Sequence, residues 1–139
     1  MDLYTEFEWR GLLYDATEGA RDALAREKVT GYIGFDPTAP SLHVGSLLVM
    51  VVLAHLQRHG HSPIALVGGG TGLIGDPSGK TVERQLLTAE RVEENVAGIR
   101  AQLSRFLDFE SRTAPARLVN NAEWLGTQGA SDFMRDVGK

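Results

Sequence analysis

The sequence contains no cysteine, which excludes disulfide bonds, thiolate catalysis and cysteine-ligated metal sites. It also lacks the features of a segment for export or membrane insertion. Its N-terminus, MDLYTEFEWRG, carries acidic residues where a secretion signal needs a basic start and an apolar run. The longest apolar stretch covers residues 47–54 and is far too short to span a bilayer. We therefore expect a cytoplasmic protein with no membrane contact.

An excess of basic residues is also missing. The chain has 14 Lys and Arg against 18 Asp and Glu, which gives a formal net charge of −4. This balance excludes a nucleic-acid-binding segment that is held by charge alone. The composition that is present is typical of a globular protein, because 42% of the 139 residues are hydrophobic and 23% are charged. The length suits one modest domain.

Helical and strand patterns alternate along most of the chain. We expect helices over residues 2–11, 18–26, 47–60, 88–106 and 131–137, and strands over residues 29–35, 63–67 and 117–120. The helix after residue 47 is apolar nearly all round, which is typical of a buried helix. The helix that begins near residue 88 carries one apolar stripe, made of Val92, Val96, Ile99, Leu103 and Phe106. The alternation predicts an α/β fold, a Rossmann-like parallel sheet with right-handed crossover helices.

The loops that follow the three predicted strands are candidates for a ligand site. They are residues 36–38, the glycine-rich loop that begins at Gly68, and Asn120-Asn121. Ligands of parallel sheets bind beyond the C-terminal ends of the strands. All three loops should therefore lie on one edge of the sheet.

The glycine-rich stretch GGGTGLIGDPSGKT, residues 68–81, has three interpretations. Residues 70–75 fit the dinucleotide fingerprint G-x-G-x-x-G, but Asp76-Pro77 favours a turn where that motif continues into a helix. Residues 75–81 resemble a P-loop that is one residue too short. The third interpretation is a tight connection without a ligand. Lys80 and Arg84 argue against it, because cations on the expected ligand edge could close over a polyphosphate.

A second phosphate signal lies where the strand over residues 29–35 leads into the apolar helix. The start of a helix offers unpaired backbone N–H groups and the positive end of the helix dipole. The first turn after His43 contains no Asp or Glu that would neutralise this end. Gly45 lowers the stability of a helix, and the close approach of a flat ligand to the backbone would account for it. We interpret His43 as a hydrogen-bond donor to a phosphate.

These motifs together resemble a known family. The sequence His43-Val44-Gly45-Ser46 is similar to the HIGH signature of class I aminoacyl-tRNA synthetases. The stretches YIGFDPT, residues 32–38, and GLIGDPSG, residues 72–79, resemble those of bacterial tyrosyl-tRNA synthetases. The similarity extends to NNAEW at residues 120–124 and RDVGK at residues 135–139. It implies that residues 1–139 form the N-terminal part of the nucleotide-binding catalytic domain, with an incomplete sheet and without the anticodon-binding domain.

The family joins tyrosine to ATP with release of pyrophosphate and then transfers the tyrosyl group to its tRNA. The resemblance therefore implies a tyrosine–tRNA ligase that takes ATP with Mg²⁺ as a substrate. It implies no permanently bound cofactor, no metal site of the protein itself, and a homodimer at full length. The alternatives are a P-loop or dinucleotide-binding enzyme and a non-catalytic nucleotide-binding fragment.

Matching the family's motifs position by position implies a role for individual residues. Contacts to ATP are expected from Gly34, Asp36, Thr38, His43, Gly45 and Ser46. Contacts to tyrosine are expected from Tyr32, Asp36, Gly70, Asp76 and Asn121. The catalytic residues are expected to be Thr38 and His43, near the γ-phosphate, and Lys80 and Arg84, over the pyrophosphate. Ser46 replaces the second histidine of the signature, so a hydroxyl group would lie near the ribose.

We predict that residues 1–139 alone do not activate tyrosine. The chain ends before the family's second signature, a lysine-rich loop, so cations that stabilise the departing pyrophosphate would be missing. Tyrosine-dependent ATP–pyrophosphate exchange by the purified chain should stay at the level of a tyrosine-free control. Exchange clearly above that control would contradict the prediction.

Overall fold

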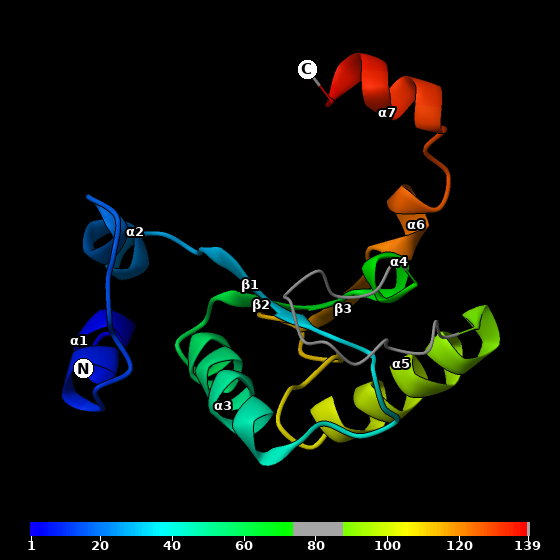
Figure 1. Ribbon diagram of the computed structural model, residues 1–139. Helices are drawn as coiled ribbons and strands as arrows, with labels where there is room; N and C mark the ends of the chain where they lie inside the picture. The colour runs from blue at the N-terminus through cyan, green and yellow to red at the C-terminus, as the bar shows by residue number, and fades with distance from the viewer. Residues whose placement is uncertain (74–87, 139) are drawn as a thin grey trace.

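The computed structural model describes residues 1–73 and 88–138, and its centre is one parallel sheet. The sheet has three strands in the order β1-β2-β3, with β1 at Thr30–Phe35, β2 at Ser62–Val67 and β3 at Arg117–Asn120 (Figure 1). The helices are α1 (Leu3–Trp9), α2 (Ala20–Arg26), α3 (Val44–Arg58), α4 (Gly69–Gly72), α5 (Ala89–Leu103), α6 (Ala122–Leu125) and α7 (Ala130–Asp136).

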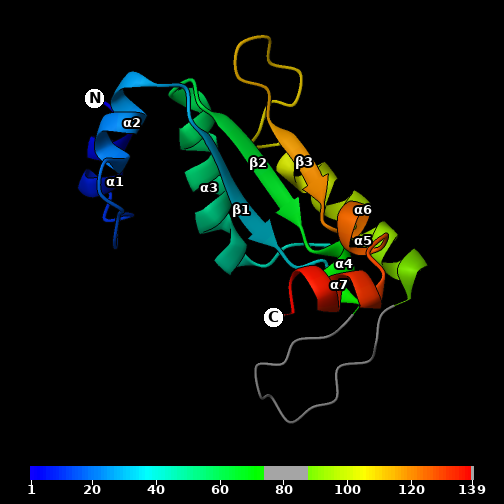
Figure 2. The ribbon, with the colours of Figure 1, turned by 90° about the horizontal axis from the view of Figure 1, so that it is seen from above.

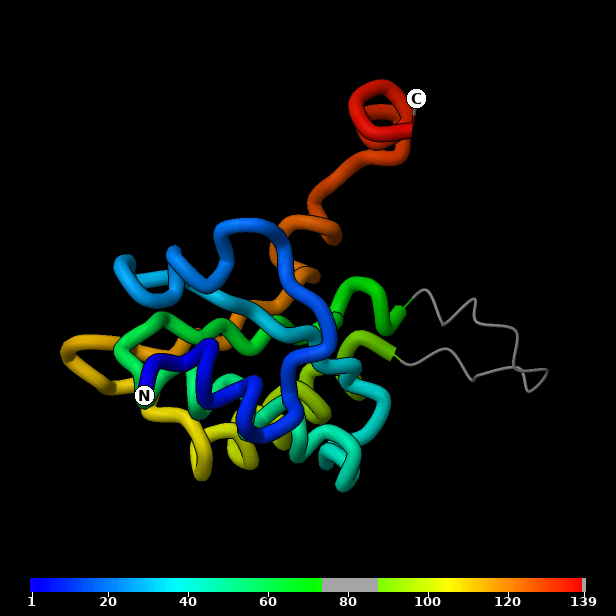
Figure 3. The backbone as a smooth tube through the Cα atoms, turned by 90° about the vertical axis from the view of Figure 1, so that its left-hand side faces the viewer, coloured from blue at the N-terminus to red at the C-terminus, as the bar shows by residue number. Residues whose placement is uncertain are grey.

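The two long helices, α3 and α5, lie on the same side of the sheet. Figures 1 and 3 show both helices together below the strands, whereas α7 stands apart from the sheet. This arrangement follows from the strand order. Because each successive strand is added on the same side of the previous one, two right-handed crossovers place their helices on the same face. The expected Rossmann-like arrangement of parallel strands and crossover helices is confirmed.

The three strands end level with one another. In the ladder, Phe35 pairs with Val67, and Val67 pairs with Asn120, so the last residues of β1, β2 and β3 form one row. Figure 2 shows the three arrowheads directed toward the edge where α4 and α6 lie. The loops after residues 35, 67 and 120 therefore begin on one edge, as the sequence predicts.

The hydrophobic core lies between the sheet and the two long helices. Residues of β1 and β2 alternate in burial, as expected for strands with one face against helices. The predicted stripe of α5 faces this core, because Val92, Ile99 and Leu103 are buried and Val96 packs against the core cluster. Phe106 is the exception, since it follows the end of α5 and is 39% exposed.

The expectation that the apolar helix is buried is wrong for its first half. Within the expected range of residues 47–60, Leu47 is 40% exposed and Leu48 is 57% exposed, whereas Leu53 and Ala54 are buried. The buried residues of the helix, from Met50 to Leu56, lie in its second half, whereas its first turns are more exposed. The short helices α4 and α6 were not expected either, because each has only four residues.

Helix α1 packs against the far end of α3, and α2 packs against α1. Asp2 caps α1 through a 2.8 Å hydrogen bond from the Thr5 amide, as the sequence predicts. Leu3 is buried in the core, and the ring of Phe7 meets that of His55 edge to face, with 6.5 Å between the ring centroids. None of the helices within the described ranges combines the length and the hydrophobicity that crossing a membrane requires.

Two leucines of α3 provide a matched test of where the core lies. Leu53 is 1% exposed and Leu48 is 57% exposed. Leu53→Ala should lower the free energy of unfolding by about 2–5 kcal/mol, because it removes buried methyl groups and leaves a cavity. Leu48→Ala should change it by less than about 0.5 kcal/mol. Urea unfolding followed by circular dichroism measures both, and equal losses would contradict this placement of the core.

Candidate functional site

A pocket of about 410 Å³ lies between the end of β1 and the start of α3. It is lined by Gly34, Phe35, Asp36, Thr38, Ser41, Leu42, His43, Gly45, Ser46 and Val49. All six residues that the resemblance assigns to ATP are among them. The strand end, the loop after it and the first turn of a helix therefore surround one volume.

The first turn of α3 forms the electropositive wall of this pocket. His43 is the N-cap residue with extended backbone (φ −88°, ψ 170°), and its side chain makes no capping hydrogen bond in the described part of the chain. The first turn of α3, which is described in full, contains no acidic residue. The unpaired N–H groups and the positive end of the helix dipole are thus available to an anion.

Two glycines leave room in the pocket in different ways. A Cβ atom at Gly34 would have no heavy atom within 4 Å, so that side of the pocket is open space. A Cβ atom at Gly45 would lie 2.9 Å from the ring of His43, so a side chain there would displace the imidazole. Gly45 therefore leaves space for the His43 ring. This explains the glycine at this position in a way that differs from the close approach of a ligand expected from the sequence.

The loop between β1 and α3 is held in place by α5, through residues that sequence analysis missed. The Asn95 side-chain amide donates a 2.8 Å hydrogen bond to the Pro37 carbonyl oxygen. The Leu42 amide donates a 2.7 Å hydrogen bond to Oε1 of Gln102. Asn95 is 1% exposed and lies on the buried, otherwise apolar face of α5. A polar residue on that face is the sequence signal that could have identified this contact.

A second polar network joins the ends of β2 and β3. The Gly69 amide donates to Oδ1 of Asn120 at 3.1 Å, and the Gly70 amide donates to Oδ1 of Asn121 at 2.8 Å. The Asn121 side-chain amide in turn donates to the Thr71 hydroxyl at 3.2 Å. The structure thus brings together Gly70 and Asn121, two residues that the resemblance assigns to tyrosine.

Tyr32 lies on the face of β1 away from α3, and Asp36 follows directly after the strand. Alternate residues of a strand share a face, so Tyr32 and Gly34 point away from the side of Gly31, where a Cβ atom would meet Leu56 of α3. Tyr32 is 70% exposed there. Oδ1 of Asp36 lies 3.6 Å from the position of a Cβ atom at Gly68, which places Asp36 between the pocket and the glycine network. Asp76, Lys80 and Arg84 lie outside the described residues.

Comparison with known proteins agrees with this geometry. Residues 24–139 match the family described as tRNA synthetases class I (W and Y). The chain belongs to this family. The resemblance to class I synthetases is therefore confirmed, and the match favours it over the dinucleotide and P-loop interpretations of the glycine loop.

The individual relatives named in the comparison act on tyrosine. The chain is 60% identical to a tyrosine–tRNA ligase of Roseiflexus castenholzii over 134 residues, which covers 96% of this chain and 32% of that protein. It is 54% identical to the tyrosine–tRNA ligase of Staphylococcus carnosus, with 99% of this chain and 33% of that protein covered. The chain thus spans about a third of the length of these curated relatives.

Solved structures of the same family share the fold. A C-terminally truncated mitochondrial tyrosyl-tRNA synthetase of Aspergillus nidulans aligns with a TM-score of 0.81 at 27% identity, covering 99% of this chain and 42% of that chain. The corresponding enzyme of Coccidioides posadasii aligns with a TM-score of 0.72 at 32% identity, covering 99% and 40%. The present chain therefore shares its parallel strands and crossover helices with both of these synthetases of known structure.

Gly98 of α5 provides a test of the loop's anchorage. A Cβ atom at this position would overlap the carbonyl group of Pro40, so Gly98→Ala must displace the loop over residues 36–43. We expect lower stability and weaker binding of ATP in equilibrium dialysis, although alanine favours a helix interior over glycine by about 1 kcal/mol. The exposed neighbour Ala97, changed to glycine, measures this helix propensity alone. Gly98→Ala with raised stability and unchanged ATP binding would contradict the contact.

Proposed function

We propose that this chain forms the ATP-binding part of a tyrosine–tRNA ligase. The observation that carries the proposal is the pocket that contains all six residues assigned to ATP by motif. The names of the curated relatives, at 52–60% identity, support tyrosine as the amino acid. In this reaction the tyrosine carboxylate attacks the α-phosphorus of ATP, the bond to pyrophosphate breaks, and the tyrosyl group then passes to tRNA.

The proposed binding of ATP divides between the two sides of the pocket. Thr38 and His43 would contact the γ-phosphate end, beside the positive end of α3. The adenosine would lie against the backbone at Gly45, with the ribose near the hydroxyl group of Ser46. Gly34 borders open space, which leaves room for the nucleotide.

Catalysis in this proposal depends on charge that develops at the departing pyrophosphate. Groups that bind this charge more strongly in the transition state than in the ground state accelerate the step. Thr38 and His43 are two such groups, and Lys80 and Arg84 are the proposed cations that complete the set. Magnesium would enter with ATP, as an ion bound to the phosphates.

The proposed tyrosine site lies on the other side of Asp36. Tyr32 would contact the phenol hydroxyl, and Asp76 the ammonium group of the substrate. Gly70 and Asn121 are hydrogen-bonded to each other at 2.8 Å and would form part of the far wall. Asp36 would lie between the two substrates, because it lines the ATP pocket and approaches Gly68.

We further propose tRNA as a partner, a homodimer as the assembly of the full-length enzyme and the cytoplasm as its compartment. The two-step reaction requires the tRNA, and ATP, tyrosine and tRNA meet in the cytoplasm. The family resemblance supports the dimer.

A chimeric enzyme tests the proposed function directly. This chain would replace the corresponding part of the Staphylococcus carnosus ligase, with which it is 54% identical over 99% of its length. We expect tyrosine-dependent ATP–pyrophosphate exchange and tyrosyl-tRNA formation. Circular dichroism and thermal unfolding establish that the chimera is folded. A folded chimera without exchange would overturn the proposal.

The same chimera tests the role of His43. His43→Ala should lower the kcat of tyrosine activation by about 100-fold, since a donor to developing charge is lost, while the KM for tyrosine changes little. Val44→Ala is the matched control, because Val44 lies on the same turn, is 86% exposed and does not line the pocket. A His43→Ala enzyme with an unchanged kcat would remove this residue from the proposed mechanism.

A further inference from the structure

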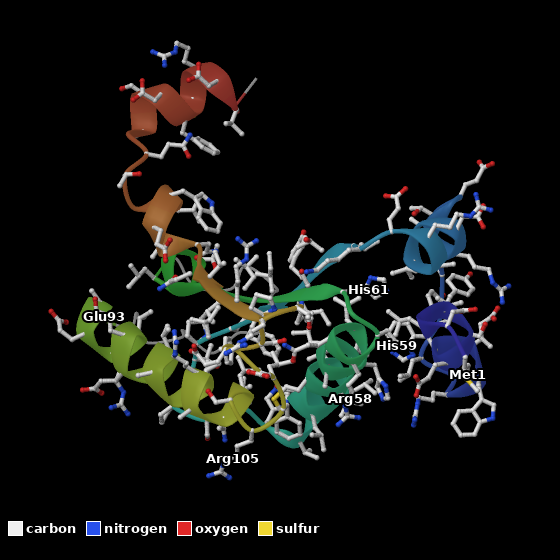
Figure 4. All side chains as sticks on the ribbon, turned by 180° about the vertical axis from the view of Figure 1, so that it is seen from behind. Met1, Arg58, His59, His61, Glu93 and Arg105 are labelled. Atoms are coloured by element: carbon white, nitrogen blue, oxygen red, sulfur yellow. The ribbon has the colours of Figure 1, made fainter. Side chains whose placement is uncertain are left out.

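A cluster of one carboxylate and two histidines lies where α1 meets the end of α3, away from the ATP pocket. Oε1 of Glu6 is 3.3 Å from Nδ1 of His55, and Oε2 of Glu6 is 3.2 Å from Nε2 of His59. The potential ligand atoms of the three residues lie within 4.8 Å of one another. Figure 4 labels His59 at the end of α3 that faces α1. About 18 Å of helix separates His55 from His43, at 1.5 Å per residue.

The contacts of His59 place its ring nitrogen Nε2 against a carboxylate oxygen, where a cation can bind between the two atoms. Its Nδ1 lies 2.9 Å from the carbonyl oxygen of His55, which can only accept, so Nδ1 carries the proton. In the neutral ring, Nε2 then has no proton, and its lone pair faces the Glu6 carboxylate, whose Oε2 lies 3.2 Å away. Two acceptors at this distance require a proton or a metal ion between them. Donation of the other ring N–H to a carbonyl is also the usual arrangement of a histidine that binds metal.

The candidate site combines one carboxylate and two imidazoles with two neighbouring arginines. A histidine binds a metal ion through a neutral imidazole, and the ring of His55 is buried, with 6% of the residue exposed. Glu6 offers one carboxylate oxygen to each of the two imidazoles, at 3.3 Å and 3.2 Å. Arg10 binds Oε1 of Glu6 at 2.9 Å, which leaves Oε2 for an ion. Arg10 and Arg58 are the competing positive charges.

The donor set and its spacing match zinc. Two histidine nitrogens and one glutamate oxygen are ligands that Zn²⁺ takes at about 2.0–2.2 Å. Ligand atoms at that distance from a tetrahedral ion lie about 3.4 Å apart, close to the 3.2 Å between Oε2 of Glu6 and Nε2 of His59. His55 and His59 are four residues apart, on one face of a helix. The side chains of Glu6 and His59 are 16% and 22% exposed, so a water molecule has access to the fourth position.

We propose that Glu6, His55 and His59 bind a divalent metal ion of the zinc type, which fastens α1 to α3. The family resemblance implies no metal site of the protein itself, and the cluster forms only because the fold brings Glu6 beside the two histidines. The ion would be structural and would not take part in the proposed reaction. Its binding energy would add to the stability of the folded chain.

Titration of the purified chain with Zn²⁺ tests the proposal, with a chromophoric chelator as competitor. We expect one site, together with a rise in Tm on addition of Zn²⁺. Both Glu6→Gln and His59→Gln should weaken Zn²⁺ binding by more than about tenfold, because each removes a ligand. Arg10→Gln should tighten it severalfold, because a competing positive charge is removed. Cobalt(II) in place of zinc should give the intense visible absorption of a four-coordinate ion.

The matched control is His43→Gln, which removes an exposed histidine at the other end of α3. It should leave Zn²⁺ affinity within about twofold, the change expected for a group that does not touch the ion. Absence of a zinc site in the folded wild-type chain would overturn the proposal and leave His59 paired directly with Glu6. Equal losses in His43→Gln and His59→Gln would also overturn it, because they would indicate unspecific binding to surface histidines.

Discussion

The register of the parallel sheet is the constraint on which the rest of the structure depends. Because Phe35, Val67 and Asn120 end their strands in one row, the chain leaves the sheet three times at the same level. The N-terminal end of α3, the glycine helix α4 and the asparagine pair are therefore neighbours. A shift of one residue in either pairing would turn the alternating side chains of a strand to the opposite face. The pocket beside Asp36 exists only in the observed register.

Most of the fold could be predicted because its signals are local. Strands over residues 30–35, 62–67 and 117–120 are short apolar runs that end in turn residues, and α5 carries a stripe with helical period. The burial of α3 could not be predicted in this way. Leu48 is as apolar as Leu53, so the sequence alone does not show which of the two the rest of the fold covers.

The candidate site also combines residues that are close in the sequence with residues that are distant in it. His43, Gly45 and Ser46 lie in one short motif, so their proximity follows from a single helix start. The residues that hold the loop are distant in sequence: Asn95 contacts Pro37 across 58 positions, and Gln102 contacts Leu42 across 60. No local pattern predicts which polar residue of a helix will meet a given loop carbonyl. The residues that hold the loop can therefore be identified only from the folded structure. The residues of the motif that lines the pocket can be identified from the sequence.

Helix α3 connects two regions of opposite electrostatic character. At its start, the N–H groups and the dipole favour an anion, and no acidic side chain of the first turn competes. At its end, the carbonyl groups and the dipole favour a cation, and His55, His59 and the Glu6 carboxylate lie there. Leu53 and Leu56 fix the second half of the helix in the core, and the continuous helix connects this half to its first turn. Anchoring α1 at the cation end thus also restrains the helix whose first turn lines the proposed ATP pocket.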